Sequence, residues 1–201
     1  MQINLEKTIH KLFFVVLLPA LSIGASWLFF KLIPNPPFWL ETLSPLGAYG
    51  LLYAWFNNSA WKWKFFRIIG LVIYPDLNGR WSGTQISTFK EDGKNVETET
   101  CLEIKQNFSR IIVKAFYPKS ESKSVVAVFA QFGEDTYLYY TYDNDPNSLK
   151  TGTMQNHKGT SKLIYLPKDK KLIGSYFNSI GNTGDISLKF ENSETFNCFK
   201  Q

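Results

Sequence analysis

The chain has 201 residues, of which 44% are hydrophobic, 16% aromatic and 19% charged, and this composition is too apolar for a disordered protein. Residues 1–73 hold 6 of the 22 Lys and Arg and 2 of the 17 Asp and Glu, which leaves 16 basic and 15 acidic residues for 74–201. The net charge is therefore +4 in the first part and +1 in the second, which argues against duplex nucleic acid as a partner of the larger part.

The first predicted element is a membrane span. Residues 12–30 form an uncharged apolar run between Lys11 and Lys31, and a bilayer core of roughly 30 Å needs about 20 helical residues. We expect a span over about 12–33. A cleaved signal peptide is the alternative, but this run exceeds the usual length of a signal-peptide core and no small-residue cleavage site follows it.

A second uncharged run, 42–61, predicts a second span that is more polar at its end. Three prolines lie between the two runs and are incompatible with a helix interior, so residues 33–41 are predicted as a turn outside the membrane. The result is a transmembrane helical hairpin. Three tryptophans near its end are typical of an interfacial aromatic belt. They are Trp55, Trp61 and Trp63.

Basic residues flank both outer ends of this hairpin. They are Lys7 and Lys11 before the first span, and Lys62, Lys64 and Arg67 after the second. The turn between the spans has one lysine, which is balanced by one glutamate. Because positive flanks remain on the cytoplasmic side, we expect both termini in the cytoplasm.

From residue 74 onward the sequence alternates between apolar and polar residues, with short turns typical of antiparallel strands. Eight strands are predicted, over Gly79–Phe89, Val96–Gln106, Ser109–Tyr117, Lys123–Phe132, Thr136–Asp143, Gly159–Leu166, Lys171–Asn178 and Gly184–Glu191, with one long polar loop at 144–156. Short turns favour a meander, and closure removes its two bare edges. The predicted fold class is membrane-anchored all-β: a transmembrane hairpin in 1–73 and a small eight-stranded antiparallel meander β-barrel in 74–201.

Alternation also predicts which side chains face the barrel interior. In the second strand Leu102 and Ile104 point inward, whereas Glu103 lies on the solvated face. The fifth strand is ambiguous because both of its faces are half aromatic. A barrel of this size holds its own side chains or one small ligand. The predicted ligand contacts among the polar inward candidates are Gln85, Thr100, Tyr139, Tyr176 and Asn178. The alternative is an ordinary mixed core with tyrosine hydroxyls at its rim.

Catalytic and metal-binding patterns are absent from the sequence. His10 and His157 are its two histidines, which is too few for a His-rich metal site, and no triad can be assembled around them. Cys101 and Cys198 are far apart, and a cytoplasmic location keeps thiols reduced. No phosphate-binding or dinucleotide-binding glycine loop occurs. We expect no cofactor, no metal and no enzymatic activity.

The junction Tyr74–Thr84, with Gly-x-Trp at the opening of the first strand, resembles lipocalin-like barrels, in which a tryptophan plugs the closed end. With two predicted spans directly upstream, the whole chain is similar to the two-transmembrane, β-strand-rich effectors of bacterial CBASS anti-phage systems. This resemblance implies a barrel that binds a cyclic dinucleotide made by a partner nucleotidyltransferase. It also implies a homo-oligomer that breaches the lipid bilayer of the bacterial inner membrane.

Two bases of such a ligand would stack on aromatic side chains, and two phosphates would need cationic or N–H donors. Basic candidates are few: Arg80 and Arg110 are the only arginines after residue 67, and alternation places Arg110 outside. Rim lysines such as Lys162 and Lys171 have the alternative of being solvated strand charges. Two other functions remain open, a membrane-tethered lipid carrier and a structural interaction module.

Overall fold

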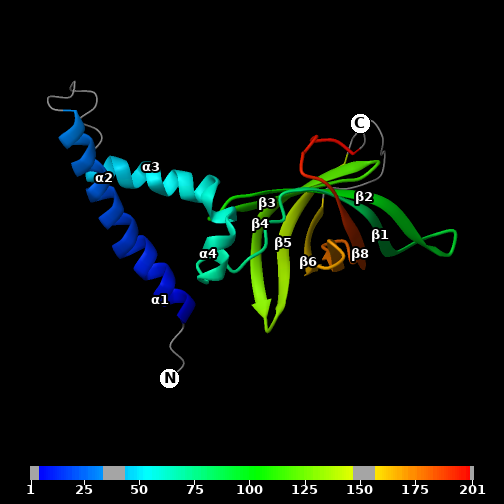
Figure 1. The fold of residues 1–201 in the computed structure, drawn as a ribbon. Helices are drawn as coiled ribbons and strands as arrows, with labels where there is room; N and C mark the ends of the chain where they lie inside the picture. The colour runs from blue at the N-terminus through cyan, green and yellow to red at the C-terminus, as the bar shows by residue number, and fades with distance from the viewer. Residues whose placement is uncertain (1–4, 34–43, 147–156, 200–201) are drawn as a thin grey trace. The chain divides into compact units, whose positions relative to one another are not determined.

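The structure, a computed structural model, describes residues 5–33, 44–146 and 157–199. The chain forms two compact units. The first comprises Met1–Ile73 with Asn107–Ser109, and the second comprises Tyr74–Gln106 and Arg110–Gln201. The described secondary structure of the first unit is helical, and that of the second consists of strands (Figure 1).

The N-terminal unit begins with one long helix, made of α1 (Leu5–Lys11), a π-helical turn η1 (Leu12–Leu17) and α2 (Leu18–Leu32). The π turn directly precedes Pro19, whose ring excludes an ordinary helical bond, and Leu18 N–H bonds to the Phe13 carbonyl, five residues back. By length and composition, Thr8–Leu32 can cross a bilayer, and it is the single such helix in the part of the chain that the structure describes. The first span was predicted in this region.

The second predicted span, 42–61, is not one continuous helix. In this region α3 (Pro45–Asn58) has 14 residues, and at 1.5 Å per residue its length of about 21 Å is less than a bilayer core. A 3-10 turn, η3 (Ala60–Lys62), and a short helix, α4 (Lys64–Ile68), follow it. The prediction of two full spans is therefore corrected to one long apolar helix with a shorter helix packed against it. The turn predicted over 33–41 lies almost wholly outside the described residues.

Aromatic side chains form the core of this unit. The ring centroids of Phe13 and Phe56 lie 5.0 Å apart, and Phe66 is also 5.0 Å from Phe56. Trp61, predicted to lie in an interfacial belt, is buried in this cluster instead, because α3 ends at Asn58 and the chain turns through η3. Trp63 remains exposed, as an interfacial side chain would be.

Eight antiparallel strands close the second unit into a barrel, in the order in which they occur in the sequence. They are β1 (Gly79–Glu91), β2 (Lys94–Gln106), β3 (Ile111–Phe116), β4 (Ser120–Phe132), β5 (Asp135–Pro146), β6 (His157–Leu166), β7 (Lys171–Asn178) and β8 (Thr183–Asn192). Pairing of β1 with β8 closes the barrel (Figure 1). It places Trp81 opposite Phe190. The predicted eight-stranded meander barrel is confirmed. β5 includes Asn144, which was predicted as loop, and 147–156 lie outside the described residues.

The register of β5 settles which of its two aromatic faces points inward. Leu138 lies opposite Leu163 of β6, and both belong to the buried core, so Tyr140 and Tyr142 also point inward. Tyr139 therefore faces outward, and its predicted inward orientation is wrong. Hydrophobicity could not separate the two faces because both carry tyrosines.

The segment after β8 covers part of the outer surface of the barrel. Glu103, predicted to be solvated, is 1% exposed because this segment lies over it. The Glu103 carboxylate accepts two backbone N–H groups of the segment and pairs with Arg80 Nη1 at 3.0 Å. Arg80 also donates to two backbone carbonyl groups of the same segment. A charge pair is thus buried outside the barrel core.

Candidate ligand-binding site

The barrel interior has an apolar half, at the end where β1 begins. Trp81 lies there, 2% exposed, and its indole Nε1 donates to the backbone carbonyl of Leu77 at 2.9 Å. The other buried aliphatic side chains of this half are Leu102, Ile104, Leu138, Leu163, Leu172 and Leu188. With its one polar atom satisfied, Trp81 packs as an ordinary core side chain.

The other half of the interior is polar, and it lies towards the ends of β1, β3, β5 and β7. Alternation along these strands and their neighbours brings small polar and tyrosine side chains to one place. They are Gln85, Thr100, Tyr117, Ser122, Tyr140, Tyr142, Asn144, Ser161 and Tyr176. This set is the candidate ligand-binding site.

Two glycines make room for its tyrosines. Tyr142 lies opposite Gly159, and a Cβ at position 159 would overlap the Tyr142 hydroxyl. Tyr176 lies opposite Gly184, where a Cβ would crowd the Tyr176 ring. The absence of a side chain at these positions of β6 and β8 therefore lets both rings lie across the interior.

The tyrosine hydroxyls are close enough to influence one another. Burial, together with Tyr140, Tyr142 and Tyr176, holds the pKa of Tyr117 well above its usual value. Burial raises the pKa of Tyr140 to about 12 and also raises that of Tyr142. The Tyr117 hydroxyl donates to Gln85 Oε1 at 3.0 Å. At neutral pH these groups are uncharged hydrogen-bond donors and acceptors.

Two buried polar atoms in this half lack hydrogen-bond partners within the described ranges, Asn144 Nδ2 and Ser161 Oγ. Ser161 Oγ lies near the Tyr140 hydroxyl and lowers the pKa of that hydroxyl, against the larger effect of burial. The two groups nevertheless do not reach hydrogen-bond geometry. A buried polar group without a partner costs about 1–3 kcal/mol, so such groups are rare in stable cores. They are the strongest structural sign that this half of the barrel receives a polar ligand.

The rim of the polar half is formed by strand ends and turns. His157, the first residue of β6, lies opposite Asn144 and shares its face. Asn178, at the end of β7, accepts the backbone N–H of Asn182 at 2.9 Å and so shapes the β7–β8 turn. The predicted sixth strand begins at Gly159, whereas the observed strand begins at His157 and places this side chain at the rim.

Of the five predicted ligand contacts, the structure brings together Gln85, Thr100 and Tyr176 in the polar half, with Asn178 at its rim. Tyr139 lies on the outer surface, near Lys162, whose Nζ is 5.7 Å from the Tyr139 ring centroid. The roles of these residues in ligand binding remain predictions.

Sequence reasoning missed most of the inward polar side chains of β5 and its neighbours. They are Tyr117, Ser122, Tyr140, Tyr142, Asn144 and Ser161. One signal could have found those on β5, because Thr141 and Asp143 share the face of Tyr139 and mark it as the solvated one.

The arginine predicted to be available for phosphate is engaged elsewhere, since Arg80 lies outside and pairs with Glu103. None of the side chains of the polar half named above carries a charge at neutral pH. No cluster of metal ligands occurs among the residues that the structure describes. The site can therefore bind by hydrogen bonding and stacking, and a bound phosphate would rely on neutral donors and rim residues.

A closed antiparallel barrel with unpaired polar groups inside belongs to the class of small-ligand-binding barrels. Residues 72–190 match the family described as Cap15, cyclic dinucleotide receptor domain, and the chain belongs to this family. It is also 31% identical over 142 residues to the CD-NTase-associated protein 15 of Yersinia aleksiciae. That match covers 69% of this chain and 64% of the Yersinia protein. The resemblance to CBASS β-barrel effectors is thereby confirmed at the level of the family.

Proposed function

We propose that this protein is a membrane-anchored effector of a CBASS anti-phage system and that a cyclic dinucleotide binds in the polar half of its barrel. The family match over 72–190 supports the ligand class. The name of the Yersinia relative, CD-NTase-associated protein 15, supports a nucleotidyltransferase as functional partner. The observation that carries the site is the pair of unpartnered polar atoms, Asn144 Nδ2 and Ser161 Oγ.

The chemistry of the polar half suits such a ligand. Tyrosine rings offer stacking surfaces worth about 1–3 kcal/mol per base. Base edges present both donors and acceptors, which an amide such as Asn144 and hydroxyls such as Ser161 complement. A cyclic ligand is preorganised and loses less entropy on binding, so we expect it to bind more tightly than the linear dinucleotide.

The second part of the proposal is that binding drives oligomerisation and that the oligomer breaches the inner membrane. Thr8–Leu32 supports membrane insertion by its length and composition. With lysines on both flanks of the N-terminal unit, both termini are cytoplasmic, which requires the chain to return across the bilayer between Ile33 and Lys62. A bilayer confines the chains and raises their effective concentration, so a modest gain in contact can shift the assembly equilibrium. No catalytic step is assigned.

Calorimetric titration of the full-length protein in detergent with cyclic di-AMP, cyclic di-GMP, cyclic GMP-AMP and cyclic trinucleotides tests the site. We expect at least one cyclic dinucleotide to bind. Tyr142→Ala should weaken its binding by about 1–3 kcal/mol if the ring stacks on a base. Tyr139→Ala is the matched control, since the same side chain is lost from the outer surface of the same strand.

Absence of binding across the panel, with lipid copurifying instead, would favour the lipid-carrier function. The polar half argues against that function, because a carrier of apolar molecules needs an apolar interior.

A further inference from the structure

The barrel wall is incompletely paired between β3 and β4. Three residue pairs join these strands, from Lys114 opposite Lys123 to Phe116 opposite Glu121. β4 nevertheless continues to Phe132 and pairs with β5 up to that residue. In the described chain, the stretch 126–132 of β4 therefore has a strand partner on one side only, and we call it the β4 edge.

A bulge separates the paired part of β4 from the β4 edge. The register against β5 shifts directly after Ser124, whose Oγ accepts the Val113 N–H at 2.9 Å in place of a backbone carbonyl of β4. Ala127 and Phe129 beyond the bulge point inward but are only partly buried. The Phe129 ring stacks on Tyr74, with 5.0 Å between ring centroids, so the segment before β1 covers part of the inner side of this gap. The backbone of the β4 edge still has no second strand partner in the described chain.

The outer surface of the β4 edge is apolar. Val126, Val128 and Phe132 are 55%, 50% and 60% exposed, and Phe132 packs edge-to-face on Tyr137 of β5 with 5.7 Å between ring centroids. Edge strands of monomeric proteins are usually protected by lysine, proline or short length. Residues 124–132 contain no charged residue and no proline. An exposed, uncharged strand edge of this kind is a template for strand addition.

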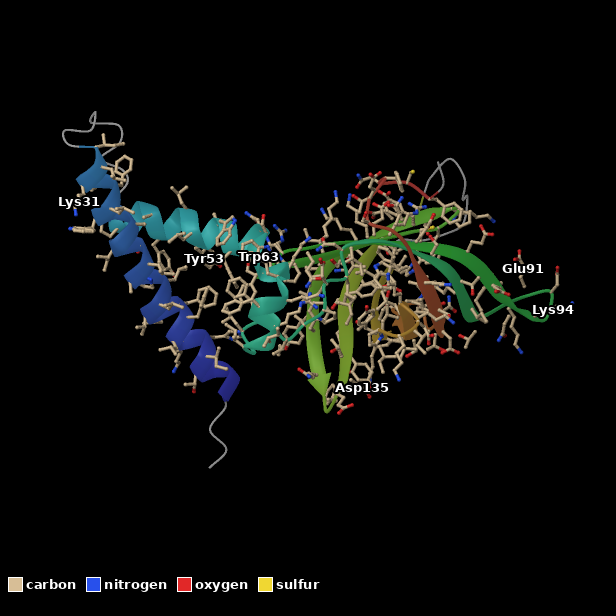
Figure 2. All side chains as sticks on the ribbon, viewed as in Figure 1. Lys31, Tyr53, Trp63, Glu91, Lys94 and Asp135 are labelled. Carbon is tan, nitrogen blue, oxygen red and sulfur yellow. The ribbon has the colours of Figure 1, made fainter. Side chains whose placement is uncertain are left out.

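The charges at the two ends of the β4 edge specify the occupant. Lys123 precedes it, and Glu134 and Asp135 follow it at the tip of the β4–β5 hairpin, where Figure 2 shows Asp135. If two copies of β4 pair antiparallel over 126–132, the acidic hairpin tip of each approaches the end of the β3–β4 pairing in the other, where Lys123 lies opposite Lys114. Parallel pairing would instead place like charges together. The edge is thus complementary to itself across a two-fold axis.

We propose that the β4 edge is the contact at which a second copy of this chain adds its own β4, in antiparallel orientation. The inference rests on the proposed function, whose oligomer it provides with a contact surface. β4 itself contributes Ser122 to the candidate site, and its Ser124 and Ala127 pair with Tyr142 and Tyr140 of β5. A ligand that orders β5 therefore acts on the strand to which the β4 edge is bonded.

Disulfide cross-linking of the full-length chain in membranes tests the contact directly. Val128→Cys should give oxidised dimers at least about tenfold above the wild-type background from Cys101 and Cys198. Phe177→Cys is the matched control, since this side chain is 58% exposed on the outer surface of β7. Cross-linking at 177 in preference to 128, or at neither position, would overturn the proposal.

Charge substitutions test the antiparallel register. Lys123→Glu and Asp135→Lys should each weaken self-association in detergent, measured by sedimentation velocity with and without cyclic di-GMP, cyclic di-AMP and cyclic GMP-AMP. The double variant should restore it, because the two charges exchange sides. If both single variants associate like the wild type, or if the double variant is no better than either, the proposed pairing is wrong.

The double variant Val126→Lys/Val128→Lys should reduce association about tenfold or more, with Phe177→Lys as its control.

Calorimetry on the same samples separates this inference from the proposed function. If no cyclic dinucleotide binds, the proposed function fails, and cross-linking at position 128 still decides the inference. If a ligand binds and drives assembly that Val126→Lys/Val128→Lys leaves unchanged, the inference fails and the proposed function stands.

Discussion

Arg80 and Glu103 form an ion pair on the outside of the barrel, 3.0 Å between Nη1 and Oε1, although their side chains are 5% and 1% exposed. The two residues lie opposite each other in the β1–β2 register, on the face turned away from the core. Burial comes from the C-terminal segment, whose backbone N–H and carbonyl groups complete the hydrogen bonds of both charges. The segment is therefore bound to the barrel mainly through this pair.

We expect Glu103→Ala to destabilise the protein by about 1–3 kcal/mol, because two backbone N–H groups lose their acceptor and the Arg80 guanidinium keeps only the half-exposed Glu191 as an anionic partner. Urea unfolding followed by tryptophan fluorescence measures the change. Glu97→Ala, an exposed carboxylate on the same face of β2, is the control and should change stability by less than about 0.5 kcal/mol. Equal effects of the two substitutions would show that the C-terminal segment does not bury the pair in solution.

The buried tyrosines predict a loss of stability in alkali. Burial raises the pKa of Tyr140 from 10.0 to about 12, so the folded state disfavours the phenolate that the unfolded chain forms. Ionisation of Tyr140 therefore leaves the free energy of unfolding unchanged below pH 10. It lowers that free energy as the pH rises from 10 towards 12. Melting temperatures between pH 7 and pH 11.5 measure it, and Tyr140→Phe should reduce the decline. A decline that begins well below pH 9 would contradict this assignment.

Both termini are expected in the cytoplasm. Alkaline phosphatase fused after Gln201 should be inactive, whereas a fusion within 35–38 should be active, because the enzyme folds outside the cytoplasm. Green fluorescent protein at the same positions gives the complementary readout. Because α3 is shorter than a bilayer core, this test also decides whether the chain returns across the membrane. Phosphatase activity after Gln201 with none at 35–38 would reverse the topology.

The proposed membrane breach depends on the N-terminal unit. Co-expression of the full-length protein with a cyclic-dinucleotide synthase should depolarise the inner membrane, measured with a potential-sensitive dye. Deletion of 1–61 should abolish depolarisation and leave cyclic dinucleotide binding by the barrel intact. Toxicity of the truncated form, or consumption of the nucleotide by the full-length protein, would require a different mechanism.

Local pattern was sufficient for the architecture of the second unit. Alternation and short turns predicted eight antiparallel strands in a closed meander, because strand period and turn chemistry are properties of adjacent residues. The same reasoning oriented β2 correctly, since the apolar Leu102 and Ile104 alternate there with charged residues. It failed for Tyr139 because both faces of β5 carry tyrosines, and the pairing of Leu138 with Leu163 shows which face points inward.

Three features depend on contacts between residues distant in sequence, so no local pattern could predict them. The C-terminal segment covers Glu103, 93 positions before Phe196, and turns a surface charge into a buried one. The polar half gathers Gln85 of β1, Tyr117 directly after β3 and Tyr142 of β5. The β4 edge arises because β3 pairs with β4 only from Lys114 to Phe116, whereas β5 pairs with β4 as far as Phe132. Sequence determined the strands, and tertiary pairing determined which side chains meet, because register and closure are cooperative properties of the whole sheet.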